Sequence, residues 1–333
     1  MFKNFKTRFK TLETGFLSVA VIAAGVNLGG CSLNSASTDL YGPFSVPAKY
    51  TFVIDPPEKE SERNQSWLLT GFQTLEGANT PDERASVYTG LGLVYEELGL
   101  NFISRYMYMN SIVMNPKNPD AFSHLGYHFT LSDRIDDAVE SYSALRELEK
   151  NSKNRYSYLD SAFTMYYTGH NEAASEDIEK YYSEASSDPY HILWRYIIQS
   201  KSKGRQEALE DLRASYNTAL DAISESGDKK RDWGFNLVEL YLGIMSYDAL
   251  FDDIKKSIDD DETFQSHLCE AYFYIAKLEQ EKGYDKLCYD YLTLCLATLK
   301  YNFIEYRAAK LEVRNLKRRY HLLKKEQEDA SLD

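Results

Sequence analysis

A pattern of small and aromatic residues recurs three times between Arg84 and Pro189 at nearly constant spacing. The step from Gly92 to Gly126 is 34 residues, and the step from Gly126 to Ala162 is 36. Similar residues surround each position, namely Tyr88, Leu91, Gly92, Tyr95, Gly99, Tyr108 and Pro116; then Phe122, Leu125, Gly126, Phe129, Ala138 and Tyr142; then Tyr158, Ala162, Met165, Gly169, Ala174 and Ile178. Such a repeat constrains the fold strongly, because each copy must form one supersecondary unit.

The spacing has a physical reason in the way two helices of a pair approach each other. A glycine or alanine on the first helix lets the second come close, and aromatic side chains fill the remaining gap. One pair leaves an apolar face in water, so about three or more pairs must stack before the array is stable. The pattern resembles tetratricopeptide repeats and predicts an all-α fold, a solenoid of helical hairpins with extra flanking helices. An ordinary helical bundle is the alternative, but it does not require positions that recur in register.

A fourth copy and two flanking regions complete the predicted organisation. The fourth copy contains Tyr272, Ile275, Ala276, Gly283, Cys288, Leu292 and Cys295. We expect an N-terminal helix and three repeats over 64–190 (repeats 84–117, 118–153 and 154–189), a degenerate helical hairpin over 191–262, the fourth repeat over 263–313 and a charged tail over 314–333. Thr80-Pro81-Asp82-Glu83 predicts a helix start, with a hydroxyl cap, proline at the first position and acids in the first turn.

After the presequence, the largest basic cluster lies on the expected last helix. Its members are Arg307, Lys310, Arg314, Lys317, Arg318, Arg319, Lys324 and Lys325. The simplest expectation is a solvated capping helix. Contact with anionic lipid headgroups, or with an acidic face of a second copy, is the alternative.

The first 30 residues predict a signal peptide. Four basic side chains precede an apolar run over 15–28 that is too short for a comfortable membrane span. Leu28-Gly29-Gly30-Cys31 resembles a bacterial lipobox, which implies cleavage between Gly30 and Cys31, a diacylglycerol on the thiol and an acyl chain on the freed amine. Ser32, in place of aspartate, implies sorting to the outer membrane. A plain secretory signal or an uncleaved helix is the alternative. Residues 31–63, rich in Ser, Asn and Pro, predict a flexible tether.

The net charge limits the classes of binding partner, and the positions of the cysteines indicate their chemical state. The formal net charge is −13, and because residues 1–30 carry four basic and one acidic side chain, the rest of the chain carries −16. This balance argues against nucleic acid as a partner. Cys288 and Cys295 occupy small, packed repeat positions, so we expect buried thiols rather than reactive ones there. Cys269 should lie opposite Cys295 on the partner helix, and whether these two form a disulfide in an oxidising periplasm is left open by the sequence.

The sequence contains no convincing catalytic pattern. His124 and His128 would share a helix face, as zinc ligands do in a metalloprotease, but Leu125 stands where the catalytic glutamate is needed. We therefore favour a place on the helix surface or in packing contacts for both histidines over a metal site. Residues 90–95 nearly match a dinucleotide fingerprint, yet they lie inside a helix with no preceding strand. We therefore expect no catalytic residue, no metal and no cofactor apart from the lipid on Cys31, and an enzyme is the weakest of three hypotheses.

Short local motifs accompany the repeats, namely Val94-Tyr95, Leu98-Gly99-Leu100, Leu125-Gly126, Tyr166-Tyr167-Thr168-Gly169, Asp188-Pro189, Leu193-Trp194, Trp233-Gly234, Val238-Glu239, Tyr241-Leu242-Gly243, Tyr301-Asn302-Phe303 and Glu305. With these motifs the chain resembles the NlpI lipoproteins of Gram-negative bacteria from about residue 66 to residue 312, with a gap between Arg205 and Lys230. The long basic presequence, the longer tether, an insertion near 219–227 and the basic tail depart from the family.

The resemblance implies a homodimeric outer-membrane adaptor that faces the periplasm. It would bind a C-terminal processing protease and peptidoglycan hydrolases such as DD-endopeptidases, and so regulate hydrolase turnover and cell division. The alternative is a repeat lipoprotein that assembles outer-membrane proteins or pili.

A client-binding groove is expected where the first helices of the repeats line the concave face. The predicted groove residues are Thr89, Leu93, Glu96, Ser123, Tyr127, Tyr156, Leu159, Phe163 and Tyr166. Exposed aromatic residues flanked by acids suit an extended peptide or a helix. Each of these side chains could instead pack against the neighbouring hairpin.

Overall fold

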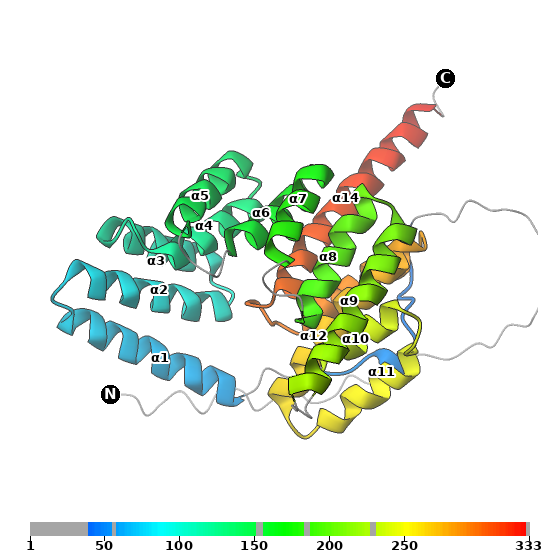
Figure 1. Cartoon of the computed structure of the whole chain (residues 1–333), viewed down its shortest axis with the longest axis horizontal. Helices are drawn as coiled ribbons and strands as arrows, with labels where there is room; N and C mark the ends of the chain where they lie inside the picture. Colours follow the sequence, from blue (N-terminus) through cyan, green and yellow to red (C-terminus); the bar gives the residue numbers. More distant parts are fainter. Residues whose placement is uncertain (1–38, 55–57, 151–155, 183–186, 227–230, 331–333) are drawn as a thin grey trace, which may run out of the picture. The chain divides into compact units, whose positions relative to one another are not determined.

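The computed structural model describes residues 39–54, 58–150, 156–182, 187–226 and 231–330 (Figure 1). Within these ranges the chain is helical and contains no β-strand. The helices are α1 (Glu58–Gly77), α2 (Pro81–Glu97), α3 (Asn101–Met114), α4 (Pro119–Leu131), α5 (Ile135–Leu148), α6 (Tyr156–Tyr167), α7 (Asn171–Tyr182), α8 (Pro189–Ser202), α9 (Arg205–Ser226), α10 (Gly234–Tyr241), α11 (Tyr247–Ile254), α12 (Asp261–Glu281), α13 (Asp285–Ala297) and α14 (Ile304–Ala330), with 3-10 helices η1 (Ala48–Tyr50) and η2 (Lys255–Ser257). The predicted signal peptide, with Gly30 and Cys31, lies outside the described residues.

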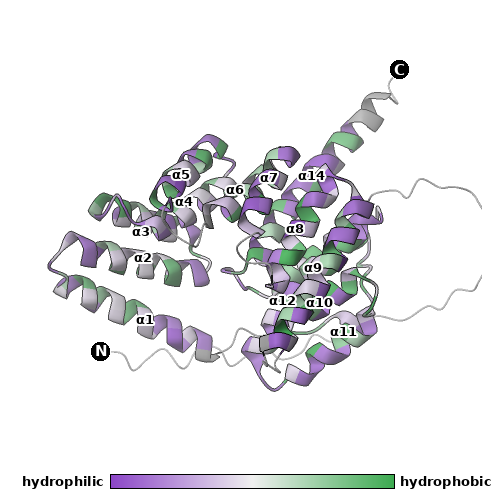
Figure 2. Cartoon of the chain, in the orientation of Figure 1, coloured by the Kyte–Doolittle hydropathy of each residue, from purple (hydrophilic) through white to green (hydrophobic). Residues whose placement is uncertain are grey.

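Consecutive helices form the packing units of the fold. The pairs are α2 with α3, α4 with α5, α6 with α7, α8 with α9 and α12 with α13. Each of the first three pairs also contacts the next, through α3 with α4, α5 with α6 and α7 with α8. Most helices carry both hydrophilic and hydrophobic residues (Figure 2), as expected when one face is buried in a stack. The predicted all-α array of helical hairpins with flanking helices is confirmed.

The repeated glycines lie where helices touch. Gly92 on α2 is buried, and a Cβ added there would stand 2.5 Å from Cε1 of Tyr108 on α3. Gly126 on α4 faces Tyr142 on α5 in the same way. Ala162 on α6 is fully buried at the third corresponding position. The small residues therefore point into the helix contacts and not into water, as the repeat pattern predicts.

The predicted start of the first repeat is also found. The Thr80 side chain accepts a hydrogen bond from the Glu83 backbone N–H at 3.2 Å, and the Glu83 carboxylate accepts from the Thr80 N–H at 3.0 Å. Pro81 occupies the first helical position. This capping box satisfies backbone donors that the first turn of α2 would otherwise leave unpaired.

The flexible tether expected over 31–63 is wrong for the part that the structure describes. Leu40, Val46 and Tyr50 are buried, and the Tyr50 ring stacks on Phe251 with centroids 4.4 Å apart. The Tyr272 hydroxyl donates to the Tyr50 carbonyl at 2.7 Å. The apolar residues between the prolines explain this packing, because they add to the core formed by α11 and α12. Helix α1 then begins at Glu58, inside the predicted tether.

The expected boundary between the fourth repeat and a charged tail, at residue 313, falls inside one continuous helix. Helix α14 runs from Ile304 to Ala330 and contacts α4, α12 and α13. Leu316 is buried, and Arg314 donates to the Leu131 carbonyl at 2.9 Å. The early part of the predicted tail is therefore a packed element rather than a solvated extension.

Substitutions at two glycines of α2 should have opposite effects on stability. We expect Gly92→Ala to lower the free energy of unfolding by about 1–3 kcal/mol, because the buried Tyr108 ring has no room to move away. Gly90→Ala should raise it by about 0.5–1 kcal/mol, because a Cβ at Gly90 meets no atom within 4 Å and alanine favours the helix. Urea denaturation of both variants checks this, and equal effects would contradict the packing role of Gly92.

Candidate functional site

The predicted groove is largely filled by the chain itself. Thr89, Glu96, Tyr127 and Phe163 are buried, and Ser123, Leu159 and Tyr166 are half-buried. Leu93 is 42% exposed. The side chain of Tyr156 is not among those that the structure describes. The prediction of an open groove along all three repeats is therefore wrong for most of its residues.

Helices α8, α12 and α14 supply the groups that fill the groove. The Arg307 guanidinium lies over the Tyr127 ring, 4.1 Å from its centroid. Lys277 donates to the Tyr166 hydroxyl at 2.9 Å and forms a buried ion pair with Glu312. Phe163 packs against Trp194, with ring centroids 5.3 Å apart. The inner positions of the repeats thus form part of the core.

Two other groove positions hold helices of the array together. Thr89 exchanges a 2.8 Å hydrogen bond with Ser111, which joins α2 to α3. Ser123 donates to Asp160 at 2.5 Å, which joins α4 to α6. Burial raises the pKa of Asp160 to about 6, although this hydrogen bond acts in the opposite direction. These are the packing roles that the sequence left open as the alternative.

An apolar cavity of about 680 Å³ remains beside the filled groove. Its lining comes from α1, α2, the middle of α4, the loop before α14 and the start of α14. The residues are Trp67, Thr70, Gly71, Thr74, Val87, Gly90, Leu91, Leu93, Val94, Glu96, Glu97, His124, Asn302 and Arg307. Trp67 is 46% exposed and Leu93 is 42% exposed, so the apolar wall reaches solvent. We call this space the α1–α2 cavity. A partly open apolar space with a few convergent polar groups is typical of a binding site.

The charged groups at the base of the cavity neutralise one another. Glu96 forms an ion pair with Arg307, accepts from the Tyr108 hydroxyl at 2.7 Å, and lies 3.1 Å from Nδ1 of His124. Burial alone would raise the pKa of Glu96, but the charge of Arg307 and the hydrogen bond from His124 hold it well below its usual range. Burial lowers the pKa of His128 to about 4, against the opposing charge of Glu96. The base of the cavity is therefore a pre-formed, paired network.

Arg307 is the important residue that sequence reasoning misplaced. It was expected on a solvated capping helix, but its side chain is only 15% exposed and pairs with Glu96. One sequence signal could have found it. Glu96 lies four residues after Gly92 and seven after Thr89, so it shares the packed face of α2. An acid on a buried helix face requires a cationic partner.

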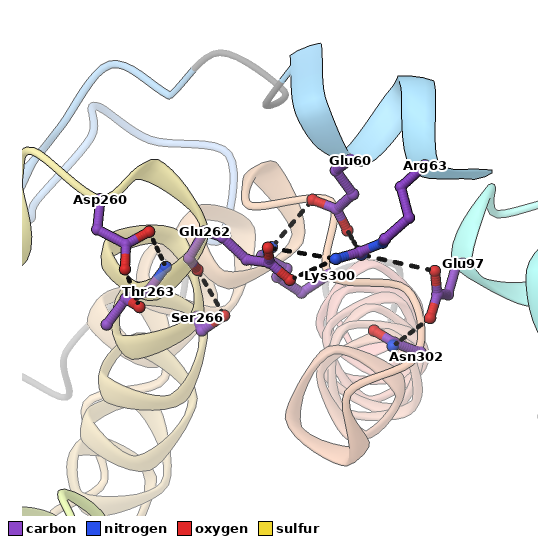
Figure 3. A network of polar contacts seen from close by, with 9 residues as sticks. All are labelled: Glu60, Arg63, Glu97, Asp260, Glu262, Thr263, Ser266, Lys300 and Asn302. Atoms are coloured by element: carbon purple, nitrogen blue, oxygen red, sulfur yellow. Dashed lines mark hydrogen bonds and ion pairs between the residues drawn. The ribbon is translucent and has the colours of Figure 1, made fainter. Parts of the chain in front are cut away.

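A polar network fixes α1 at the edge of the cavity (Figure 3). Arg63 donates to Glu262 at the start of α12 at 3.0 Å, and Lys300 donates to Glu60 at 3.1 Å. Glu97 at the end of α2 accepts from Asn302 at 3.4 Å. A single exposed ion pair contributes little, about 0–1 kcal/mol, but several sharing partners can fix an orientation. This network holds one wall of the cavity in place.

His124 and His128 share a helix face, as predicted, and both face Glu96. The distance from Nε2 of His128 to Oε1 of Glu96 is 3.8 Å, and its contact with Ser104 Oγ is 3.2 Å. Arg307 already occupies the Glu96 carboxylate that a metal ion would need. Among the described residues, no group of three or more His, Cys, Asp or Glu side chains has the arrangement of a metal site. In this structure both histidines lie against the Glu96 carboxylate, and the His124 ring stacks on Tyr108.

The three downstream cysteines are buried free thiols. The Sγ atoms of Cys269 on α12 and Cys295 on α13 lie 3.7 Å apart, which places the two residues opposite each other as expected. Burial raises the pKa of Cys288 well above its usual range. Its thiol is therefore a packing group rather than a nucleophile.

Comparison with known proteins gives a likeness of fold. No protein-family model matches the sequence. Similar solved structures include the Cut9-Hcn1 hetero-tetramer of the APC/C (TM-score 0.45, 17% identity, 77% of this chain and 46% of that chain). They also include a tetratricopeptide repeat protein from Parabacteroides merdae (TM-score 0.43, 13% identity, 81% and 99%) and PilF of Pseudomonas aeruginosa (TM-score 0.40, 15% identity, 68% and 97%). The chain spans less than half the length of the first. At these identities the likeness concerns the arrangement of helices alone.

Within the described ranges, no helix combines the length and the apolar character that crossing a bilayer requires.

The buried His128 should make stability depend on pH. Because its pKa is lowered to about 4 in the folded chain, the unfolded chain takes up a proton first as the pH falls from about 6.5. Over this window the wild type should lose up to about 1.4 kcal/mol per pH unit more than His128→Gln. Urea denaturation across pH 4–8 measures the difference. Above about pH 7 the two profiles should be parallel, and parallel profiles over the whole range would contradict the assignment.

Proposed function

We propose that this chain is an outer-membrane lipoprotein that acts as a periplasmic adaptor for cell-wall hydrolases. In this proposal Cys31 carries the lipid, and the array faces the periplasm as a homodimer. It binds a C-terminal processing protease and peptidoglycan endopeptidases, so that the bound protease degrades the endopeptidase. The array needs no chemistry of its own, because holding two clients on one scaffold makes their encounter intramolecular.

The observation that carries the binding role is the α1–α2 cavity. Its apolar wall stays open to solvent, whereas most of the predicted groove residues are covered by α8, α12 and α14. A client segment with an aromatic or aliphatic anchor would fill this cavity. The paired charges at its base require no charged group from the client.

The adaptor role can be tested with purified components and the soluble chain from Ser32 to Asp333. We expect this chain to accelerate degradation of a DD-endopeptidase by the C-terminal processing protease of the same organism. Leu93→Asp, which puts a charge on the apolar wall, should weaken client binding about tenfold or more. Titration calorimetry with each client gives the affinity.

Ile244→Asp is the matched control, because Ile244 is 59% exposed and does not line the cavity. This variant should bind both clients and accelerate degradation of the endopeptidase as the wild type does. If neither client binds, and affinity capture recovers machinery for outer-membrane protein or pilus assembly, the assembly role replaces the adaptor role. Equal losses in both variants would reject the cavity as the client site.

The lipid anchor has a separate test in cells. We expect the wild type in the outer-membrane fraction and Cys31→Ser in the soluble periplasmic fraction, because the variant cannot receive the diacylglycerol. Mass spectrometry of the wild-type N-terminal peptide should show acylated Cys31. A variant that stays in the membrane, or an unmodified cysteine in the wild type, would contradict the anchor.

A further inference from the structure

The exposed end of α14 carries a basic face. Counting along the helix, Arg314, Lys317, Arg318, His321, Lys324 and Lys325 recur at steps of three and four residues, which places them on one side. We call these six residues the α14 basic stripe. Residues 321–325 are exposed, and the Arg318 side chain is 58% exposed. In Figure 1 the last turns of α14 extend past the neighbouring helices.

One acid pairs with two members of this stripe. Asp133, after α4, pairs with Arg314 at 2.9 Å and with Arg318 at 2.6 Å. Lys317 lies over the Tyr289 ring, 5.8 Å from its centroid. Acidic residues return in the sequence only from Glu326 onward. In a chain whose portion after residue 30 carries −16, the stripe is the natural place for an anionic partner.

The N-terminal segment meets the body of the fold beside the stripe. The Tyr41 ring packs edge-on against Tyr320 of α14, with centroids 5.5 Å apart, and its hydroxyl lies 3.5 Å from Nε2 of His321. The Tyr320 hydroxyl lies 3.5 Å from the Asp39 carboxylate. Seven residues lie between Cys31 and Asp39, and the eight steps that join them span at most about 29 Å.

These contacts place the start of the described chain beside the α14 basic stripe. We propose that the α14 basic stripe binds anionic phospholipid headgroups and so orients the array on the membrane. The inference rests on the proposed lipid anchor, because acylated Cys31 would hold the end of α14 within reach of the bilayer. Lysine and arginine side chains near an anionic surface each strengthen binding roughly fivefold. The attraction extends over about 8 Å at physiological ionic strength, so contact must be close.

Vesicle binding tests the stripe without the lipid on Cys31. The soluble chain from Ser32 to Asp333 retains every described residue. We expect it to float with phosphatidylcholine vesicles that contain phosphatidylglycerol, not with pure phosphatidylcholine, and to dissociate as salt is raised. Lys324→Glu combined with Lys325→Glu should weaken binding about twentyfold or more, because two attractive charges become repulsive.

The matched control is Lys255→Glu combined with Lys256→Glu. It makes the same change in net charge at exposed lysines of η2, away from α14. It should bind like the wild type. Equal loss in both variants would mean that net charge alone acts, and absence of wild-type binding to phosphatidylglycerol would overturn the proposal. Salt-sensitive self-association without vesicle binding would instead assign the stripe to an acidic face of a second copy. Since no acyl chain is used, failure here is distinct from failure of the Cys31 anchor in cells.

Discussion

The buried pair of Glu96 and Arg307 joins the first repeat to the last helix, and much of the structure depends on it. Both side chains are removed from water, so either one alone would be a costly buried charge. Tyr108 and His124 complete the hydrogen bonding of Glu96, and the Tyr127 ring covers Arg307. With α14 fixed in this way, most inner positions of the repeats become core, and the α1–α2 cavity lies open beside them.

A second buried pair repeats this arrangement deeper in the fold. Lys277 of α12 pairs with Glu312 of α14 and donates to Tyr166 of α6. Three helices from distant parts of the sequence therefore meet at one ammonium group. Specific polar contacts of this kind impose a single alignment on surfaces that apolar packing alone would allow to slide. They explain why the filled groove has one defined geometry.

The hairpins could be predicted from the sequence because their key contacts are local. Gly92 meets Tyr108 and Gly126 meets Tyr142, each 16 residues later, so the repeat itself records the contact. Arg307 and Glu96 are 211 residues apart, and no period connects them. The same holds for Tyr50 against Phe251. The open groove and the flexible tether were therefore wrong predictions. A sequence pattern shows which face of a helix is buried, but it does not show which distant element covers that face.

The network around Arg63 also limits how this array could change in evolution. An open solenoid can gain or lose a hairpin at little cost, because each unit contacts only its neighbours. Here α1 is bonded to Glu262 and Lys300, which belong to the other end of the repeat series. An extra hairpin between them would separate these partners, so the copy number of the repeat is restricted by the ends as well as by the stacking.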